Sequence, residues 1–327
     1  MPLSLTVCTE RWPVAGSFTI ARGSRTEVDV VVAEISDGTH VGRGECVPYR
    51  RYGETIAKVL AAIEAQRDAL AHGLDLRALQ TAMTAGAARN ALDCALWDLE
   101  AKRAGRPVHV LADLPPPQPV TTALTISLGT PEVMGAAAAK AAGRALLKVK
   151  LGGDGDPERI AAVRRAAPKS ELIVDANESW SAHNLANNLA ACSAAGVTLV
   201  EQPLPQSADD ALANFSHPIA VCADESAHDR TSLERLAGKY DAINIKLDKA
   251  GGLTEALQLA DEGVRRGFML MVGCMVATSL SMAPAVLVAQ RARVVDLDGP
   301  LILARDRPHG LVYEESRVHP ATPELWG

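Results

Sequence analysis

The sequence predicts an α/β protein in which most of the chain after residue 120 forms a closed (β/α) barrel. Short apolar, strand-like runs recur roughly every 25 residues, which is typical of βα units around a parallel sheet. They end near Ser127, Lys150, Asp175, Glu201, Asp224, Lys246, Gly273 and Asp296. Ala-rich segments with helical spacing, such as PERIAAVRRAA and TEALQLADEGVRRG, fill the intervals. The alternative is an open doubly wound sheet, which we disfavour because no G-x-G-x-x-G follows any of these runs.

The region before the barrel is predicted to contain strands and then helices. TEVDVVVAEI (26–35), the turn SDGT and HVGRGECV (40–47) predict a β-hairpin. Helical spacing follows in three segments: residues 55–73, 75–83 and 88–105. Gly105 is expected to cap the last of these helices. The Pro-rich stretch DLPPPQPV (113–120) predicts a linker to the barrel.

Composition excludes several classes of protein. The chain has 327 residues, of which 48% are hydrophobic and 22% charged, as expected for a globular protein. A net charge of −6 argues against nucleic-acid and anionic-membrane partners, which require basic patches. The six cysteines lack C-x-x-C spacing, and the N-terminal residues lack the pattern of a signal peptide. We therefore expect a cytoplasmic protein without disulfides or metal-thiolate sites.

Three acidic residues end successive strand-like runs: Asp175 in LIVDANESW, Glu201 in VTLVEQPLP and Asp224 in IAVCADES. The carboxyl ends of barrel strands meet at one mouth, where catalytic groups usually lie. Repulsion among three neighbouring carboxylates would raise some of their pKa values, and a divalent cation would offset it. Ligation by oxygen alone favours Mg²⁺ over Zn²⁺. A helix N-cap or a surface charge is the structural alternative for any one of them.

Two lysines stand in an otherwise apolar strand, ALLKVKLGGD (145–154). Lys148 and Lys150 share one face because side chains alternate along a strand. We expect them to point into the barrel mouth, with pKa values lowered by burial and by mutual repulsion. Lys246 lies four strands further on, across the barrel axis. Bases on opposite sides of a substrate have the geometry of a racemase or epimerase, whereas simple pairing with carboxylates is the alternative for Lys148.

The segments KVK, DANESW, EQPLP, ADES and NIKLDKAGGLTEA occur in this order. Together they resemble the muconate-lactonizing-enzyme subgroup of the enolase superfamily over essentially the whole chain. Enzymes of this superfamily are a known example of catalysis by a Lys or His base with Mg²⁺ stabilising an ene-diolate. The resemblance implies a (β/α)7β TIM-like barrel closed by an α+β capping domain, and one Mg²⁺ per subunit. On this basis we expect the cap to comprise residues 1–112 and the tail 305–327, and the barrel to comprise residues 113–304.

A narrower resemblance concerns DLDGP (296–300) at the end of the eighth strand. In dipeptide epimerases a D-x-D at this place holds the substrate's α-ammonium group, which assigns that role to Asp296 and Asp298. ARGSRTE, PYRRYGE, AGAARNALDCALWDL and GCM are similar to segments of bacterial L-Ala-D/L-Glu epimerases that recycle murein peptides. The likeness implies further substrate contacts from Thr125, Lys148 and Cys274, and from Arg22 or Arg25 for a glutamate carboxylate. The sequence does not separate the two arginines.

The resulting expectation is a two-base 1,1-proton transfer at the glutamyl α-carbon through an enediolate. Lys150 and Lys246 would exchange the proton, with Lys148 assisting, and Asn177 and Glu225 would orient ligands or lysines. The alternatives are a cycloisomerase or o-succinylbenzoate synthase, a dipeptide epimerase of different specificity, and a barrel that binds without turnover. The exact dipeptide and the oligomeric state stay open, and a homo-oligomer is compatible with the sequence.

Overall fold

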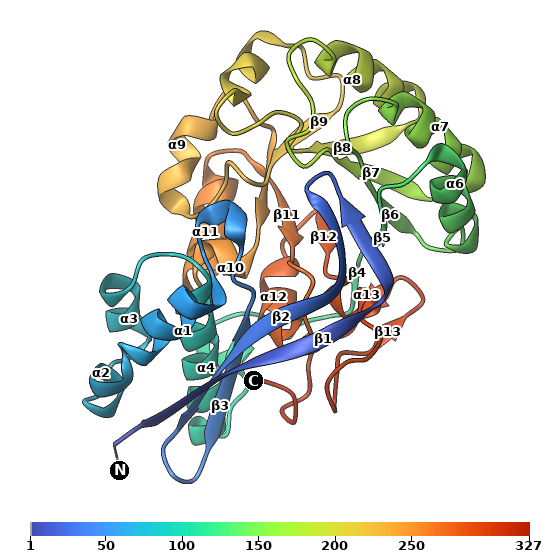
Figure 1. The fold of residues 1–327 in the computed structure, drawn as a ribbon. Helices are drawn as coiled ribbons and strands as arrows, with labels where there is room; N and C mark the ends of the chain where they lie inside the picture. Colours follow the sequence, from blue (N-terminus) through green and yellow to red (C-terminus); the bar gives the residue numbers. More distant parts are fainter. Residues whose placement is uncertain (1) are drawn as a thin grey trace.

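The computed structural model describes residues 2–327, which form a barrel with a cap packed against it (Figure 1). The cap begins with an antiparallel sheet of three strands in the order β1-β2-β3. Its strands are β1 (Ser4–Ile20), β2 (Gly23–Ser36) and β3 (Val41–Cys46). β1 and β2 make one long hairpin, whose tip reaches the barrel, where Leu128 donates a backbone hydrogen bond to Thr19 (Figure 1).

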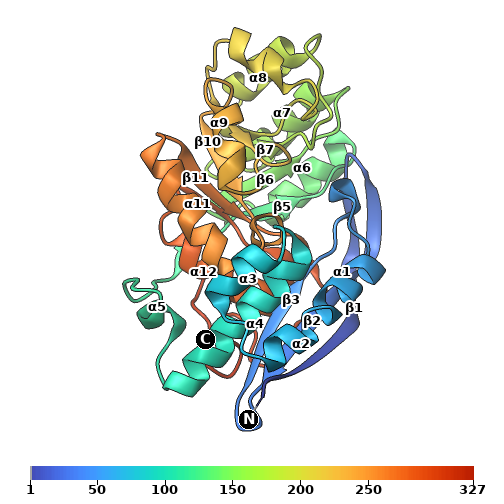
Figure 2. The same cartoon turned by 90° about the vertical axis from the view of Figure 1, so that its left-hand side faces the viewer.

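The cap helices are η1 (Arg50–Tyr52), α1 (Ile56–Glu64), α2 (Arg67–Ala71), α3 (Leu76–Ala82), α4 (Ala87–Ala104) and α5 (Val108–Leu111). Of these, α1, α2 and α4 pack on this sheet, and α3 and α5 pack on α4 (Figure 2). The single helix expected over residues 55–73 is wrong: the chain breaks it in two with a tight turn in which Gln66 N–H bonds Ile63 C=O. Both Ile63 and Leu70 are thereby buried. Gly105 ends α4 in the left-handed conformation, as predicted.

Two glycines of β3 let α4 lie directly on the sheet. A Cβ on Gly42 would stand 2.1 Å from the Ala95 carbonyl oxygen, and one on Gly44 would stand 2.0 Å from that of Ala91. No side chain fits in that space. The two glycines of HVGRGECV are therefore required for the close packing of α4 on β3. The β-hairpin predicted in this region is confirmed: it consists of β2 and β3.

The barrel is an eight-stranded parallel sheet in the order β5 to β12, which confirms the predicted architecture. Its strands are β5 (Leu124–Ile126), β6 (Leu146–Lys150), β7 (Glu171–Asp175), β8 (Val197–Glu201), β9 (Ala220–Ala223), β10 (Ala242–Ile245), β11 (Met269–Gly273) and β12 (Val294–Asp296). The backbone bond from Ala123 N to Val295 O joins the first and last strands. Each strand ends within a residue of its predicted end.

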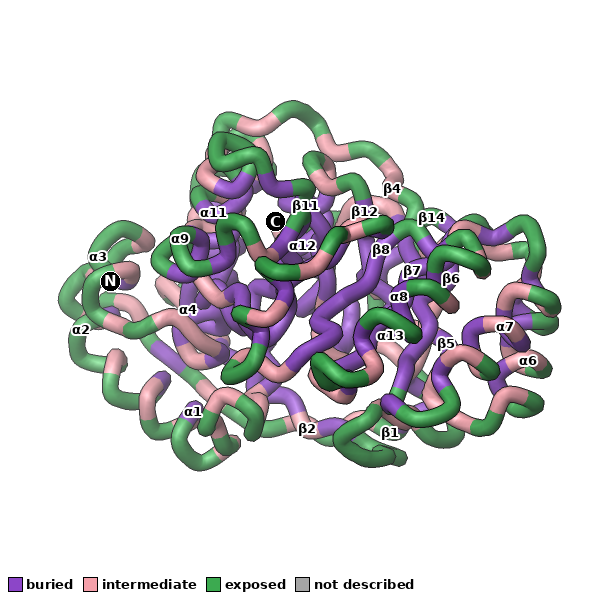
Figure 3. The backbone as a smooth tube through the Cα atoms, turned by 90° about the horizontal axis from the view of Figure 1, so that it is seen from above, coloured by how far each residue is buried: buried purple, intermediate pink, exposed green. Residues whose placement is uncertain are grey.

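Helices surround the barrel (Figure 3). They are α6 (Pro131–Lys140), α7 (Asp156–Ala166), α8 (Leu185–Ala194), η2 (Asp209–Asn214), η3 (Arg230–Ser232), α9 (Leu233–Leu236), α10 (Leu247–Ala250), α11 (Leu253–Arg265), α12 (Ser279–Ala289) and α13 (Gly299–Ile302). Most have a buried inner side and an exposed outer side, whereas α10 and α12 are buried along their whole length. Between β8 and β9 a 3₁₀-helix takes the place of the expected α-helix. The short α13 is the one helix that follows β12 in the described residues.

The barrel interior changes from apolar to charged along its axis. One apolar residue from each strand, or from just before it, forms a buried layer at the amino-terminal end: Ala123, Leu146, Ile173, Leu199, Cys222, Ala242, Met271 and Val294. Two residues further along most of these strands, the inward side chain is polar or ionisable. The alternation of strand side chains thus places the chemistry at the carboxyl-terminal mouth.

The C-terminal residues contact both parts of the molecule. β13 (Tyr313–Glu314) and β14 (Arg317–Val318) form a small sheet with β4 (Val120–Thr121), next to the barrel. Further on, Trp326 Nε1 donates to Cys94 O in α4 of the cap. The sequence predicts that the tail belongs to the cap. The structure shows a further contact, because β14 pairs with β4 next to the barrel. All six cysteines are free. None of the helices in residues 2–327 has the length and apolar character needed to cross a bilayer.

Candidate active site

A cavity lies between the barrel mouth and the β1–β2 hairpin. Phe18 and Ile20 cover it from the hairpin, and Tyr49 and Tyr52 from the segment after β3. It contains most of the residues singled out from the sequence: Arg22, Arg25, Thr125, Lys150, Asn177, Asp224, Glu225, Lys246, Cys274, Asp296 and Asp298. Three others, Lys148, Asp175 and Glu201, are buried next to it. The structure therefore brings residues from all eight strands and the cap to one place.

The lysines of β6 are ion-paired in the barrel interior. Lys148 Nζ lies 2.6 Å from Glu201 Oε2, 2.7 Å from Asp296 Oδ2 and 3.2 Å from Asp175 Oδ2. Lys150 Nζ lies 2.6 Å from the same Asp175 oxygen. Pairing of this kind is what allows two ammonium groups on a buried strand.

Lys246 stands on the opposite wall from Lys150. It immediately follows β10, which lies four strands from β6 in the closed eight-stranded sheet. Its Nζ lies 2.7 Å from Asp224 Oδ2, and both lysines line the same cavity. A substrate held between them would present one face to each amine.

The three carboxylates predicted to bind metal are fully buried and stand on neighbouring strands. Asp175 and Glu201 are direct partners in the β7–β8 pairing. Burial and the charge of Asp175 raise the pKa of Glu201 to about 7. This agrees with the expectation that crowded carboxylates without a cation acquire raised pKa values. The Lys150 and Lys148 charges overcome burial and hold the pKa of Asp175 below its ordinary value.

These residues fit a hard divalent cation in chemistry and charge. All are oxygen donors, and Glu201 Oε2 is buried without a hydrogen bond, apart from its ion pair with Lys148. In residues 2–327 no three His, Cys, Asp or Glu side chains form a ready-made metal group. Instead, an amine lies within 2.7 Å of each carboxylate: Lys148 beside Glu201, Lys150 beside Asp175 and Lys246 beside Asp224. A bound cation would take over their place as counter-charge.

The lowered pKa expected for Lys148 is wrong in this state. Burial lowers the pKa of Lys148, but the charges of Asp296 and Glu201 outweigh it and raise the pKa above its ordinary value. Burial also lowers the pKa of Lys246, but the charges of Asp224 and Glu201 outweigh this effect and raise the pKa above its ordinary value. Pairing with carboxylates, the alternative stated above for Lys148, is therefore what the structure shows.

The D-x-D of β12 faces the cavity beside β5. Asp298 Oδ2 accepts a 2.6 Å hydrogen bond from Thr125 N, which fixes the carboxyl group at the junction of the first and last strands. Burial and the charge of Asp296 raise the pKa of Asp298 to about 7. Asp296 Oδ1 is buried without a hydrogen-bond partner. This corner of the cavity therefore offers acceptors to a donor-rich cation such as an ammonium group.

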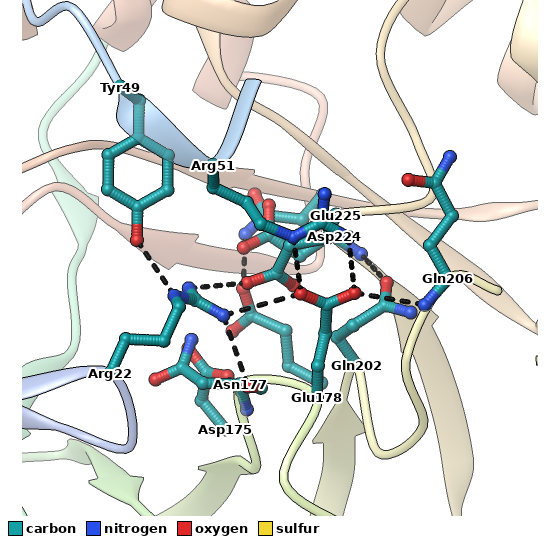
Figure 4. Close-up of polar contacts among 12 residues, drawn as sticks. Arg22, Tyr49, Arg51, Asp175, Asn177, Glu178, Gln202, Gln206, Asp224 and Glu225 are labelled. Atoms are coloured by element: carbon teal, nitrogen blue, oxygen red, sulfur yellow. Dashed lines mark hydrogen bonds and ion pairs between the residues drawn. The ribbon is translucent and has the colours of Figure 1, made fainter. Parts of the chain in front are cut away.

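The two candidate arginines have different surroundings. Arg22 donates to Glu225 Oε1 at 2.7 Å, to Asn177 O at 3.1 Å and to Tyr49 Oη at 3.1 Å (Figure 4). Arg25 lines the cavity with its guanidinium 5.9 Å from the centre of the Tyr49 ring. Glu225 thus holds Arg22 rather than a metal ligand or a lysine. Asn177 does orient a candidate ligand, because its backbone N–H donates to Asp175 Oδ1.

Sequence reasoning missed Lys249, a third buried lysine. Its Nζ donates to Asp224 Oδ1 and O, both at 2.6 Å, and to Asn244 O at 2.9 Å. Lys246 and Lys249 therefore hold the two carboxylate oxygens of Asp224 separately. The signal was present in NIKLDKAGG, where the two lysines lie one helical turn apart.

The glycine pair after Lys249 shows how the cap reaches the site. Gly251 and Gly252 both have positive φ, and a Cβ on either would clash with Arg89 or Asp93 of α4. Arg89 donates to Gly251 O, and Asp93 accepts from Thr254 N. Helix α4 of the cap thus supports the segment that carries Lys246.

Two family models match most of the chain. Residues 3–112 match the mandelate racemase/muconate lactonizing enzyme N-terminal domain. Residues 133–323 match the enolase C-terminal domain-like model.

Relatives of known activity cover the chain almost end to end. The L-Ala-D/L-Glu epimerase of Escherichia coli K12 is 48% identical over 315 residues, which is 96% of this chain and 98% of that protein. An N-acetyl-D-glutamate racemase of a Pseudoalteromonas species is 45% identical over 91% of this chain and 95% of that protein.

Solved structures are similar over the same length. An enolase family member from Agrobacterium tumefaciens with homology to dipeptide epimerases, bound to sodium and L-Ala-L-Glu, gives a TM-score of 0.99 at 56% identity and covers 100% of both chains. The dipeptide epimerase of Enterococcus faecalis V583, complexed with Mg and L-Leu-L-Tyr, gives a TM-score of 0.91 at 28% identity and covers 99% of both chains.

Proposed function

The chain belongs to the mandelate racemase/muconate lactonizing enzyme family of the enolase superfamily, and on this premise we propose that it is an L-Ala-D/L-Glu epimerase. The observation that carries the proposal is the pair Lys150 and Lys246, which face one cavity from opposite walls of the barrel. Such a pair can take a proton from one face of a carbon and return one to the other. A cytoplasmic role in murein-peptide recycling is part of the same proposal.

The cavity offers a complementary group for each charge of an L-Ala-Glu dipeptide. Asp296 and Asp298 would bind the α-ammonium group, whose charge matches the acceptors at the end of β12. A side-chain carboxylate needs a cation on the cap side. We assign this role to Arg25, because the guanidinium of Arg22 already bonds Glu225, Asn177 and Tyr49. Thr125 and Cys274 line the remaining wall.

Asp175, Glu201 and Asp224 would hold one Mg²⁺, the ion present in the Enterococcus faecalis complex. When bound, it would supply the positive charge that favours the enediolate form of the substrate carboxylate. Lys150 and Lys246 would then act as base and acid in turn at the glutamyl α-carbon, and they would exchange roles for the opposite stereoisomer. Lys148 would contribute a fixed positive charge beside the substrate carboxylate.

The other candidate functions differ in what they require of this cavity. Substrates of cycloisomerases and of o-succinylbenzoate synthase have no cation to match Asp296 and Asp298. An N-acylated glutamate, the substrate class named for the Pseudoalteromonas relative, would also leave these acids without an ammonium partner. A dipeptide epimerase with another side-chain preference would keep both acids and would not use Arg25.

The test is deuterium incorporation in D₂O with Mg²⁺, followed by mass spectrometry. Candidate substrates are L-Ala-L-Glu, a panel of other L-Ala-L-Xaa dipeptides, N-acetyl-L-glutamate and muconate. We expect L-Ala-L-Glu to exchange at the glutamyl α-carbon and to yield L-Ala-D-Glu, with the highest kcat/KM of the panel. Faster turnover of N-acetyl-L-glutamate or muconate than of every dipeptide would refute the proposal.

A further inference from the structure

Glu178 connects two separate parts of the cap to the barrel. Arg51 of η1 donates two hydrogen bonds to its carboxylate, Nε to Oε2 and Nη2 to Oε1, both at 2.7 Å (Figure 4). Arg22, at the tip of the β1–β2 hairpin, lies 3.5 Å from the same Oε2. The barrel itself adds a bond from Gln206 N to Oε1 at 2.9 Å. One carboxylate thus receives guanidinium groups from two cap segments that are 29 residues apart in sequence.

The backbone at Glu178 is held in an unfavourable conformation. Its φ is +65°, and that of the preceding Asn177 is +46°, although neither residue is glycine. Such a conformation persists where surrounding contacts determine it, and it occurs often at functional sites. Here it turns the Glu178 side chain away from the barrel interior, where Asp175 points, and toward the cap. The ion pairs with the arginines and the backbone bond to Gln206 are contacts that can stabilise it.

The segments held by Glu178 also cover the cavity. Arg22 follows Phe18 and Ile20, which line it, and Arg51 lies between the lining residues Tyr49 and Tyr52. Besides Glu178, the hairpin tip is tied to the barrel by Arg22–Glu225 and by the backbone bond from Leu128 to Thr19. The segment around Arg51 is joined to the hairpin through Tyr49, which accepts from Arg22. The Glu178 carboxylate therefore contacts both cap segments that cover the cavity, the tip of the β1–β2 hairpin and η1.

We propose that Glu178 is a positioning residue that holds the β1–β2 hairpin and η1 closed over the cavity and thereby sets how long a substrate is retained. It contacts no reacting atom and acts through Arg51 and Arg22. The bidentate pair with Arg51 has the stronger geometry, so it should carry most of the effect. The consequence for substrate retention rests on the proposed function, whereas the closure of the two cap segments does not.

The first experiment measures closure without substrate. Hydrogen exchange followed by mass spectrometry compares the wild-type protein with Glu178→Gln, which keeps the size and removes the charge. We expect exchange in peptides covering residues 15–25 and 49–53 to become at least about 5-fold faster. The matched control is Glu171→Gln, because Glu171 lies at the other end of β7 and pairs with Arg293 at 3.0 Å. Unchanged exchange in Glu178→Gln, or an equal increase in Glu171→Gln, would overturn the proposal.

The second experiment separates positioning from general destabilisation. With L-Ala-L-Glu as substrate, Glu178→Gln should raise KM roughly 10-fold and leave kcat unchanged or higher, because release becomes easier. Arg51→Gln should have the same effect, and the double variant should be no worse than either single variant. Additive losses, or a fall in kcat with an unchanged KM, would contradict the proposal. If the wild-type protein turned over no dipeptide, the proposed function would fail, and the exchange experiment would still decide the role of Glu178.

Discussion

Lys246 and Asp224 form a buried ion pair, with Nζ 2.7 Å from Oδ2. One partner is the proposed proton-transfer group, and the other is a proposed metal ligand. In this state each neutralises the other, so neither is ready for its proposed role. Cation binding and release of the amine are therefore expected to be linked.

Mg²⁺ should stabilise the fold, because it would bind carboxylates that are assembled only in the folded chain. At a free Mg²⁺ concentration of about 100 times Kd, binding adds about 2.7 kcal/mol to the free energy of unfolding. Thermal unfolding with and without Mg²⁺ measures this, and EDTA should reverse it. Asp224→Asn should lose the shift. A melting temperature that does not respond to millimolar Mg²⁺ would speak against the site.

Lys246→Ala should abolish epimerisation but leave α-proton exchange into D₂O for one stereoisomer of the dipeptide. The reason is that Lys150 still faces one side of the α-carbon. Lys150→Ala should show exchange for the opposite stereoisomer only. Mass spectrometry of each stereoisomer after incubation gives the result. If both stereoisomers exchanged at wild-type rates in either variant, the two-base assignment would be wrong.

Lys249→Met should lower both stability and metal affinity. Removing one partner of a buried pair typically costs about 3–5 kcal/mol, and the loss here should be smaller because Lys246 still pairs with Asp224. Asp224 would also lose the contact that fixes Oδ1. Unfolding and Mg²⁺ titration can be compared with Lys239→Met, which removes the more exposed pairs with Asp209 and Asp210. Equal Mg²⁺ affinity in the two variants would show that Lys249 does not position Asp224.

Arg25→Ala should reduce kcat/KM for L-Ala-L-Glu by roughly 10- to 100-fold, the loss of one charged hydrogen bond. Activity toward L-Ala-L-Met, which has no side-chain carboxylate, should change little. Arg22→Ala should instead affect both substrates alike, because Arg22 bonds Glu225 and not the substrate in our assignment. Selective loss of L-Ala-L-Glu turnover in Arg22→Ala would reverse the assignment of the two arginines.

Asp248→Asn should remove a pH dependence of stability. Burial raises the pKa of Asp248 from 3.8 to about 7, so the folded state binds a proton that the unfolded state has lost. Stability of the wild-type protein should therefore fall as pH rises from about 4 to about 7, on the order of 3 kcal/mol from this group. Both donors, Val47 N and Asn90 Nδ2, bond the same oxygen, Oδ1, which an asparagine retains. Urea unfolding at pH 5 and pH 8 tests this.

Equal losses of unfolding free energy between pH 5 and pH 8 in the wild-type protein and in Asp248→Asn would contradict the role assigned to Asp248. Asp93→Asn offers a comparison, since burial raises the pKa of Asp93 to about 6.

The sequence was sufficient to predict the barrel and the face on which the acids and lysines lie. The ends of β6, β7 and β8 at Lys150, Asp175 and Glu201 follow from apolar runs of fixed spacing, which is local information. The alternation of side chains then settles which residues point inward.

Contacts between the cap and the barrel could not be predicted in this way. Arg22 and Glu225 are 203 residues apart, and nothing local to either residue indicates the other. The same limit explains the wrong pKa direction for Lys148, because it depends on how closely carboxylates from other strands approach. The break between α1 and α2 depends on burial of Ile63 and Leu70 against the cap sheet, which helical periodicity does not show.

The backbone bond between Ala123 and Val295 closes the barrel, and it can form only after the last strand has been synthesised. Thr125 and Asp298, which meet beside that seam, are separated by 173 residues. During synthesis, the lysines of β6 and the three acids Asp175, Glu201 and Asp224 would emerge long before Asp298. The proposed site for the substrate's ammonium group, which needs Asp298 beside Thr125, could form only afterwards. Maturation of the catalytic pocket should therefore be among the last events of folding, and a chain lacking the eighth strand would have no such site.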